Sequence, residues 1–228
     1  MESARACCWL MDTQGLLVSS RAEIPPQKQP FAHDHPGGTD LETLVRDLKP
    51  TAIVGCAGQA ATFTEPVVRA MAEINERPIV FALSNPTSKA ECTAEQAYEW
   101  SDGRAVYASG SPFDPVKYGG QTFVPGQGNN AYIFPGVGLG ALFCGASQVT
   151  DAMFLAAARC LADMVGEDDL AAGRIYPPLS QIRDVSARIA AAVAELAWDA
   201  GLATAERPAD IEAAIRESMY QPVYPHHA

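Results

Sequence analysis

Apolar runs of strand length alternate with helical patterns over the first half of the chain. The predicted strands are the apolar runs themselves, at residues 6–11, 51–54, 78–83 and 104–108. The predicted helices lie between or before these runs, at residues 41–48, 65–75 and 94–100. Strands that are apolar throughout are typical of sheets covered on both faces, and the alternation with helices predicts βαβ units around a parallel sheet.

Polar residues mark the expected starts of two of these helices. Thr64 precedes Glu65 and Pro66, which predicts an N-cap with proline in the first turn. Thr93 and Gln96 have the spacing of a capping box, in which two side chains satisfy the free backbone amides at a helix start.

The second half of the chain is helical in pattern. The predicted helices cover residues 131–147, 151–164, 182–198 and 209–218. The third of them carries one apolar stripe, formed by Ile182, Val185, Ile189, Val193 and Leu196. We therefore expect residues 1–150 to form an α/β domain and residues 151–228 to form a helical layer packed on it.

The order of elements predicts a doubly wound, Rossmann-like parallel sheet that lacks its first βα unit. Such a fold normally opens with a strand, a G-x-G-x-x-G turn and a helix, and its second strand ends in an acidic residue. Here the first predicted strand already leads to Asp12, and no glycine-rich phosphate loop precedes it. The first domain is thus expected to be a truncated dinucleotide-binding domain.

Charge and apolar content exclude several classes of partner. The chain has 27 acidic and 16 basic residues, a balance that repels nucleic acid phosphates and anionic membranes. The apolar stretch at residues 131–146 is shorter than the roughly 20 residues that a spanning helix needs, and it contains proline and glycine. Neither nucleic acid nor a membrane is an expected partner.

Cysteine usage indicates a reducing compartment. The six cysteines form no C-x-x-C pair and several lie in apolar runs, which is typical of free buried thiols. The first five residues have neither the layout of a signal peptide nor that of a transit peptide. We expect the cytoplasm or the interior of an organelle.

Polar loops follow the predicted strands, at the sheet edge where ligands of α/β folds bind. Gly55, Ala57 and Gly58 suit a close approach of backbone to a ligand, although a tight strand–helix turn explains them equally well. Asn85 precedes Pro86, and taken alone this pair is better explained as an ordinary turn.

Two other short patterns have structural explanations. Glycines at positions 136, 138 and 140 lie inside a predicted helix, so close helix packing is the better interpretation. His33 and His35 have the H-x-H spacing of metal ligands but no third ligand, and a structural loop is the better interpretation.

Longer segments resemble the malic enzyme family, in order from about Trp9 to near the C-terminus. The sharpest are NERPIVFALSNPTSKAEC at residues 75–92, ASGSPFDPV at 108–116 and PGQGNNAYIFPG at 125–136. Further matches are FAHDH at residues 31–35 and GRIYPPL at 173–179. Ungapped matches of this length are far more specific than a glycine pattern.

The resemblance implies oxidative decarboxylation of (S)-malate to pyruvate and CO2 with reduction of NADP or NAD, assisted by Mg²⁺ or Mn²⁺. Asn85 matches an asparagine that touches substrate and nicotinamide ribose in the family. Asn129 and Asn130 match a pair of which at least one binds the malate carboxylate. An amide suits this role because it donates hydrogen bonds without adding charge. A homo-oligomer is expected for the full enzyme.

Cofactor preference depends on four residues near the N-terminus. Asp12 matches the acidic residue that accepts from the adenosine ribose, and Thr13 places a hydroxyl beside it. Lys28 matches a position at which NADP-dependent members of the family carry lysine, as this chain does. Arg21 is a second nearby cation. A 2′-phosphate favours cations, so we expect NADP; the alternatives are NAD and a solvated, uninvolved Lys28.

The family's general acid tyrosine, general base lysine, malate-binding arginine and metal ligands all match positions upstream of Trp9. We therefore assign no catalytic and no metal-binding residue to this chain, and expect it to be inactive alone. Tyr132 and Lys117 match structural positions of the family. Two rival hypotheses are a non-catalytic NAD(P)-binding module that acts with a separate chain, and another hydroxyacid oxidoreductase on the same fold.

Overall fold

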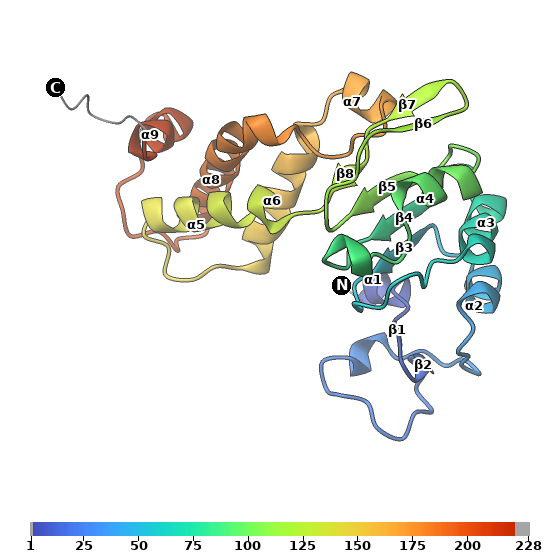
Figure 1. Ribbon diagram of the computed structural model, residues 1–228. Coiled ribbons are helices and arrows are strands. Elements are labelled where there is room, and N and C mark those ends of the chain that lie inside the picture. Colours follow the sequence, from blue (N-terminus) through green and yellow to red (C-terminus); the bar gives the residue numbers. More distant parts are fainter. Residues whose placement is uncertain (1, 222–228) are drawn as a thin grey trace. The chain divides into compact units, whose positions relative to one another are not determined.

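The computed structural model describes residues 2–221 (Figure 1). The chain divides into two compact units, Met1–Thr122 and Phe123–Ala228, and each is described by itself. The boundary predicted from the sequence, at residues 150 and 151, falls inside the second unit. That sequence-based division stays a prediction.

A parallel sheet forms the centre of the first unit. Strands β3 (Ala52–Gly55), β4 (Ile79–Ala82) and β5 (Val106–Ser109) pair side by side in parallel. The register aligns the last residues of all three, so Gly55, Ala82 and Ser109 lie in one row. The predicted α/β fold with a parallel, Rossmann-like sheet is confirmed.

Three helices accompany the sheet, as predicted: α2 (Leu41–Leu48), α3 (Glu65–Ile74) and α4 (Ala94–Trp100). Helix α3 packs against α2 and α4, and α4 contacts β5 (Figure 1). The predicted capping box of Thr93 and Gln96 is present at α4. Thr64 is the N-cap residue of α3, but its side chain makes no capping hydrogen bond.

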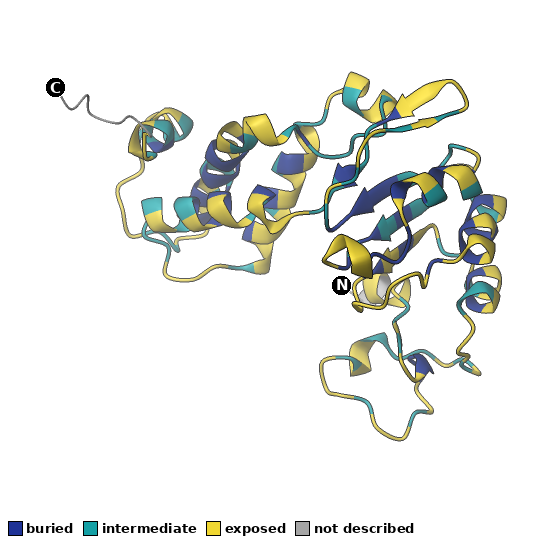
Figure 2. Cartoon of the chain, in the orientation of Figure 1, coloured by how far each residue is buried: buried dark blue, intermediate teal, exposed yellow. Residues whose placement is uncertain are grey.

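The expectation that both faces of every strand are covered is wrong for β3. Ile53 is buried, whereas the neighbouring Val54 is 56% exposed. Successive side chains of a strand point to opposite faces, so one face of β3 is packed and the other is open. Along β4, Val80 and Ala82 are fully buried (Figure 2).

The first segment differs from its prediction. Helix α1 covers Glu2–Ala6, and strand pairing begins only at Met11, so the predicted strand over residues 6–11 is wrong. Strands β1 (Met11–Asp12) and β2 (Gly15–Leu16) form a short antiparallel hairpin. Alanine, arginine and glutamate favour helix, and the segment before Trp9 has no β-branched residue to oppose them.

A second hairpin and a short strand were not predicted. Strands β6 (Val116–Tyr118) and β7 (Gln121–Phe123) pair across Gly119 and Gly120, which have φ of 57° and 81°. Two-residue turns of this kind require positive φ, so the Gly-Gly pair was a usable hairpin signal. Strand β8 covers Gly126–Gln127.

The second unit is helical and is built around α8 (Ile182–Asp199), which packs against α5, α6 and α9 and also contacts η3 and η4. The elements are η3 (Asn130–Tyr132), α5 (Phe134–Phe143), α6 (Asp151–Asp163), α7 (Glu167–Ala171), η4 (Leu179–Gln181), α8 and α9 (Ile211–Ser218). Val185, Ile189 and Val193 are fully buried on α8, which confirms the centre of the predicted stripe (Figure 2). Within residues 2–221, no helix has both the length and the apolar character to cross a bilayer.

Close packing of α5 on α8 explains two of the three helical glycines. A Cβ on Gly136 would lie 2.7 Å from Ile189 Cβ, and one on Gly140 would lie 2.5 Å from the carbonyl oxygen of Ala190. A Cβ on Gly138 would meet open space. The interpretation of this pattern as helix packing is confirmed for Gly136 and Gly140.

Candidate functional site

The polar loops after β3, β4 and β5 lie at one edge of the sheet, because parallel strands end on the same side. Open α/β sheets bind ligands in the crevice at this edge. Gly55 is the last residue of β3, and Ala57 and Gly58 follow it. Asn85 lies three residues beyond β4. The structure thus brings these predicted residues to adjacent loops.

Gly58 connects two of these loops. Its backbone N–H donates to Ser84 Oγ over 2.9 Å. Its φ is +67°, which favours glycine, and a Cβ placed there would find nothing within 4 Å. Gly58 therefore presents open backbone. Gly55 is different, since a Cβ there would lie 2.3 Å from Cδ of Glu91.

Ser111 and Gly110 orient the amide of Asn85. Ser111 Oγ donates to Asn85 Oδ1 over 2.6 Å, and a Cβ on Gly110 would lie 2.8 Å from Asn85 Nδ2. Because Oδ1 already accepts this hydrogen bond, the exposed amide offers its NH₂ group as a donor. The Asn85–Pro86 peptide bond is cis. Sequence reasoning missed the roles of Gly110 and Ser111.

A separate cleft gathers the four predicted residues near the N-terminus. It has a volume of about 740 Å³ and is lined by residues 12–14, 21–25 and 28–29. Lys28 Nζ lies 2.9 Å from Asp12 Oδ2. Arg21 Nη1 lies 3.0 Å from Asp12 Oδ1. Thr13 stands beside them in the turn of the β1–β2 hairpin.

The two cations of this cleft differ in freedom. The Arg21 side chain is 12% exposed, and its Nη2 donates to the carbonyl oxygens of Gly15 and Leu16. The Lys28 side chain is 38% exposed, and its described hydrogen bond goes to Asp12 alone. Lys28 can therefore turn toward a ligand at a smaller cost in free energy than Arg21 can. Arg21 is held by the hairpin through its hydrogen bonds to Gly15 and Leu16.

The charge pair acts strongly on Asp12. Its pKa is lowered from 3.8 to about 2, chiefly by the hydrogen bond from Lys28, with the backbone N–H of Gln14 and Arg21 also lowering it. Burial opposes this shift by raising the pKa. Asp12 therefore stays ionised at any pH at which the protein would work.

We expect acid to weaken the ion pairs that Asp12 forms with Lys28 and Arg21. A folded-state pKa below the unfolded value means that the pair stabilises the fold above about pH 4, and that this contribution is lost as the pH falls toward 2. Asp12→Asn should lower the free energy of unfolding clearly more at about pH 6 than at about pH 2.5, as measured by urea denaturation. An equal cost at both pH values would contradict this.

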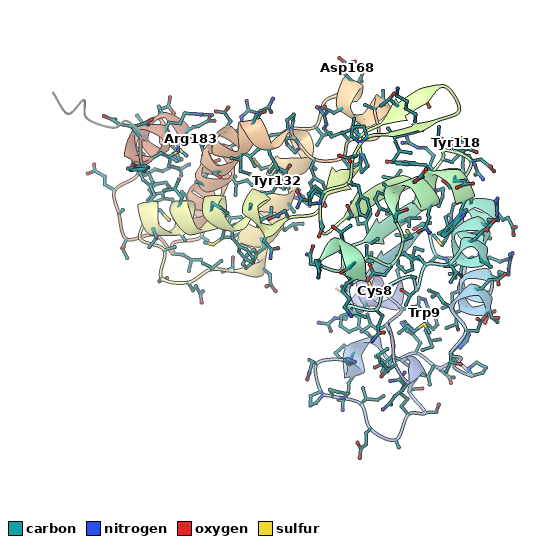
Figure 3. The ribbon with its side chains drawn as sticks, in the orientation of Figure 1. Cys8, Trp9, Tyr118, Tyr132, Asp168 and Arg183 are labelled. Carbon is teal, nitrogen blue, oxygen red and sulfur yellow. The ribbon has the colours of Figure 1, made fainter. Side chains whose placement is uncertain are left out.

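Asn129 and Asn130 belong to the second unit. Both are exposed, and Asn129 caps the short helix η3 by accepting from the N–H of Ala131 over 2.8 Å. The cap gives Asn129 a local structural role, whereas Asn130 is the first residue of η3. Tyr132, which follows, is buried among the helices of this unit and donates to the carbonyl oxygen of Pro177 (Figure 3).

The histidine loop has structural contacts. His33 stacks on Trp9 with ring centroids 3.9 Å apart, and its Nε2 lies 2.9 Å from the carbonyl oxygen of Cys8. His35 Nε2 lies 3.0 Å from Asp47 Oδ2. In the part of the chain that the structure describes, no group of three His, Cys, Asp or Glu residues could hold a metal ion.

The cysteines are free thiols. Cys92 and Cys144 are buried, whereas Cys7, Cys8 and Cys56 are exposed. Burial raises the pKa of the Cys92 thiol to about 12, which leaves almost no reactive thiolate at neutral pH. The prediction of buried thiols is wrong for Cys7, Cys8 and Cys56, which are exposed.

Comparisons with known proteins agree on one family. Residues 1–198 match the family model described as "Malic enzyme, NAD binding domain". The chain is 52% identical over 226 residues to a chloroplastic NADP-dependent malic enzyme of Oryza sativa subsp. japonica, and 53% identical to NADP-dependent malic enzyme 4, chloroplastic, of Arabidopsis thaliana. Each match covers 98% of this chain but only 35% of the relative.

A solved structure supports the fold. The crystal structure of Entamoeba histolytica malic enzyme is similar with a TM-score of 0.72 over 92% of this chain and 41% of that one. The sequence identity there is 23%, so this likeness bears on the fold alone.

Proposed function

The chain belongs to the malic enzyme family as an NAD-binding domain, and from this premise we propose that it is the cofactor-binding part of an enzyme that oxidatively decarboxylates (S)-malate to pyruvate and CO2 with reduction of NADP. The observation that carries the proposal is the identity of about 52% to NADP-dependent malic enzymes over 98% of the chain. The chain spans about 35% of those relatives' length, and we place the catalytic acid and base in a part of the enzyme that this chain does not cover.

The dinucleotide would be held at two places in the first unit. Asp12 accepts from the adenosine ribose, and Lys28 pairs with the 2′-phosphate, with Thr13 and Arg21 lining the same cleft. Gly55, Ala57 and Gly58 form the loop over which the rest of the cofactor lies. When bound, the dinucleotide would supply the hydride acceptor that oxidation of malate at C2 requires. NAD remains the alternative cofactor.

Asparagine amides would bind the substrate through hydrogen bonds. Asn85 would donate through its NH₂ group, since its Oδ1 accepts from Ser111, and would reach both substrate and nicotinamide ribose. At least one of Asn129 and Asn130 would donate to the malate carboxylate. These groups bind and orient without a charge that would oppose hydride transfer. Mg²⁺ or Mn²⁺ belongs to the proposed activity, but the described residues offer no fitting ligand set, and we place its ligands outside this chain.

Complementation tests the proposal. The chain should bind NADPH, measured by enhancement of nucleotide fluorescence, more tightly than NADH. Co-expression with the N-terminal part of a related malic enzyme should restore magnesium-dependent pyruvate formation. Failure of the chain to bind either nucleotide would contradict the proposal. Binding without restored activity would favour the rival hypothesis of a non-catalytic NAD(P)-binding module.

In the complemented enzyme, Asn85→Ala and Asn130→Ala should each lower kcat/KM for malate. Each removes a donor from a desolvated site, at a cost of about 1–3 kcal/mol, or roughly five- to 150-fold. Gln121→Ala, an exposed amide on β7, is the matched control and should change kcat/KM less than twofold. Unchanged kinetics in both asparagine variants would remove Asn85 and Asn130 from the substrate site.

The setting of the enzyme is also proposed. We infer a homo-oligomer that takes malate and releases pyruvate, without nucleic acid or membrane as partner. We place it in a reducing compartment, the cytoplasm or an organelle interior; the chloroplastic names of two relatives favour an organelle.

A further inference from the structure

Glu91 is a buried acidic residue that contacts both the loop after β4, through Ser84, and the β3–α3 loop, through Phe63. It is 1% exposed, and it lies between η2 (Thr87–Lys89) and α4. None of the salt bridges among residues 2–221 includes it. A buried carboxylate without a cationic partner is costly unless hydrogen bonds satisfy it, so its partners indicate what it does.

Both oxygens of Glu91 are engaged by Ser84. The backbone N–H of Ser84 donates to Oε2 over 3.3 Å, and the Ser84 hydroxyl donates to Oε1. A hydroxyl has one hydrogen and two lone pairs. Because that hydrogen goes to Glu91, a lone pair of Ser84 Oγ faces the N–H of Gly58, 2.9 Å away. The three groups form a directed relay from the Gly58 amide through Ser84 to Glu91.

The backbone around Glu91 holds the rest of the β3–α3 loop. Ala61 N–H donates to the carbonyl oxygen of Ala90 over 3.1 Å, and Phe63 N–H donates to that of Glu91 over 3.0 Å. Gly55 makes room for the carboxyl group, since a Cβ there would lie 2.3 Å from Cδ of Glu91. The glycine at the end of β3 is thus explained by Glu91.

We propose that Glu91 is a positioning residue which, through Ser84, sets the place and direction of the Gly58 backbone for dinucleotide binding. The inference rests on the proposed function, in which this loop lies against the cofactor. Glu91 itself is buried and touches no ligand. Its effect reaches the cofactor because Gly58 is the open, left-handed turn of the loop, and its amide direction depends on the Ser84 hydroxyl.

Amide hydrogen exchange and nucleotide affinity, measured on the 228-residue chain, test the relay. Ser84→Ala removes the acceptor of the Gly58 amide, and Glu91→Gln keeps the volume of Glu91 but replaces one acceptor oxygen by a donor. Each should raise the exchange rate of the Gly58 amide roughly three- to tenfold. The Ala61 and Phe63 amides, held by backbone carbonyls, should keep their rates, whereas general loosening would raise all three. Glu95→Gln removes an equal charge from an exposed position on α4, four residues along the chain, and is the matched control.

The affinity measurement separates positioning from stability. Well below the melting temperature of each variant, Ser84→Ala and Glu91→Gln should weaken NADPH binding by roughly three- to tenfold, and the double variant should be no weaker than Ser84→Ala alone. Unchanged Gly58 exchange would overturn the relay. Faster exchange with unchanged affinity would overturn its role in binding. A wild-type chain that binds neither NADPH nor NADH would instead contradict the proposed function, and the positioning role with it.

Discussion

The 228-residue chain alone is expected to produce no NADPH above the blank from malate, NADP and magnesium. The Asn85 amide and the hydroxyls of Ser84 and Ser111 gather at the strand ends, and these groups bind but do not exchange protons near neutral pH. The carboxyl group of Glu91 lies there too, but it is buried and accepts from Ser84, so it does not face a substrate. A general acid and a general base each contribute about 10²–10⁴-fold, so a chain without a positioned pair falls below detection.

The assay needs an internal standard. An intact malic enzyme diluted about 10⁴-fold, which spans one such contribution, sets the detection limit, and the complemented sample shows that the chain is competent. A magnesium-dependent rate that co-purifies with the chain through several columns would contradict the prediction. It would also show that acid–base groups had been overlooked among these residues.

Local patterns in the sequence predicted most of the elements that form by local interactions. The spacing of Thr93 and Gln96 was sufficient for the start of α4, because both hydrogen bonds of a capping box lie within four residues. The stripe on α8 was likewise visible, since burial repeats with the helical period. The strand predicted at residues 6–11 failed because an apolar run does not by itself distinguish strand from helix.

The site was less accessible to sequence reasoning because its contacts join distant residues. Asn85 and Ser111 are 26 positions apart, and no spacing rule connects them. Gly55 was noted as a glycine suited to ligand approach, but the structure supplies a second cause, the carboxyl group of Glu91. The four residues of the N-terminal cleft were proposed as a set, yet the pairing of both cations with Asp12 was visible only in the structure.

Because of that pairing, the cleft offers a free positive charge only when a cation leaves Asp12. Asp12 and Glu23 offset Arg21 and Lys28, so the lining residues contribute two negative and two positive charges. A 2′-phosphate entering the cleft must compete with Asp12 for a cation. Lys28 is the one able to respond, because it is more exposed and is not tied to backbone carbonyls as Arg21 is.

Lys28→Gln should therefore weaken NADP much more than NAD. A charge-assisted contact to phosphate is worth about 1.5–3 kcal/mol, or roughly ten- to a hundredfold in affinity. The variant also leaves Asp12 paired with Arg21 alone, so the carboxylate repels the phosphate more strongly while it still accepts from the ribose hydroxyl of NAD. We expect Kd for NADPH to rise by about that factor, and Kd for NADH to stay within twofold or fall.

Controls separate a local contact from general charge. Lys117→Gln removes the same charge from an exposed position on β6 and should alter neither nucleotide. Since Lys28 is partly exposed, added salt should shrink the NADPH effect, because ions screen such contacts over about 10 Å at 0.1 M. If Lys28→Gln weakens NADPH and NADH equally, the residue supports the cleft without contacting the phosphate. The preference for NADP must then come from another cation, and Arg21, tied as it is to Gly15 and Leu16, would have to be released from the hairpin to provide it.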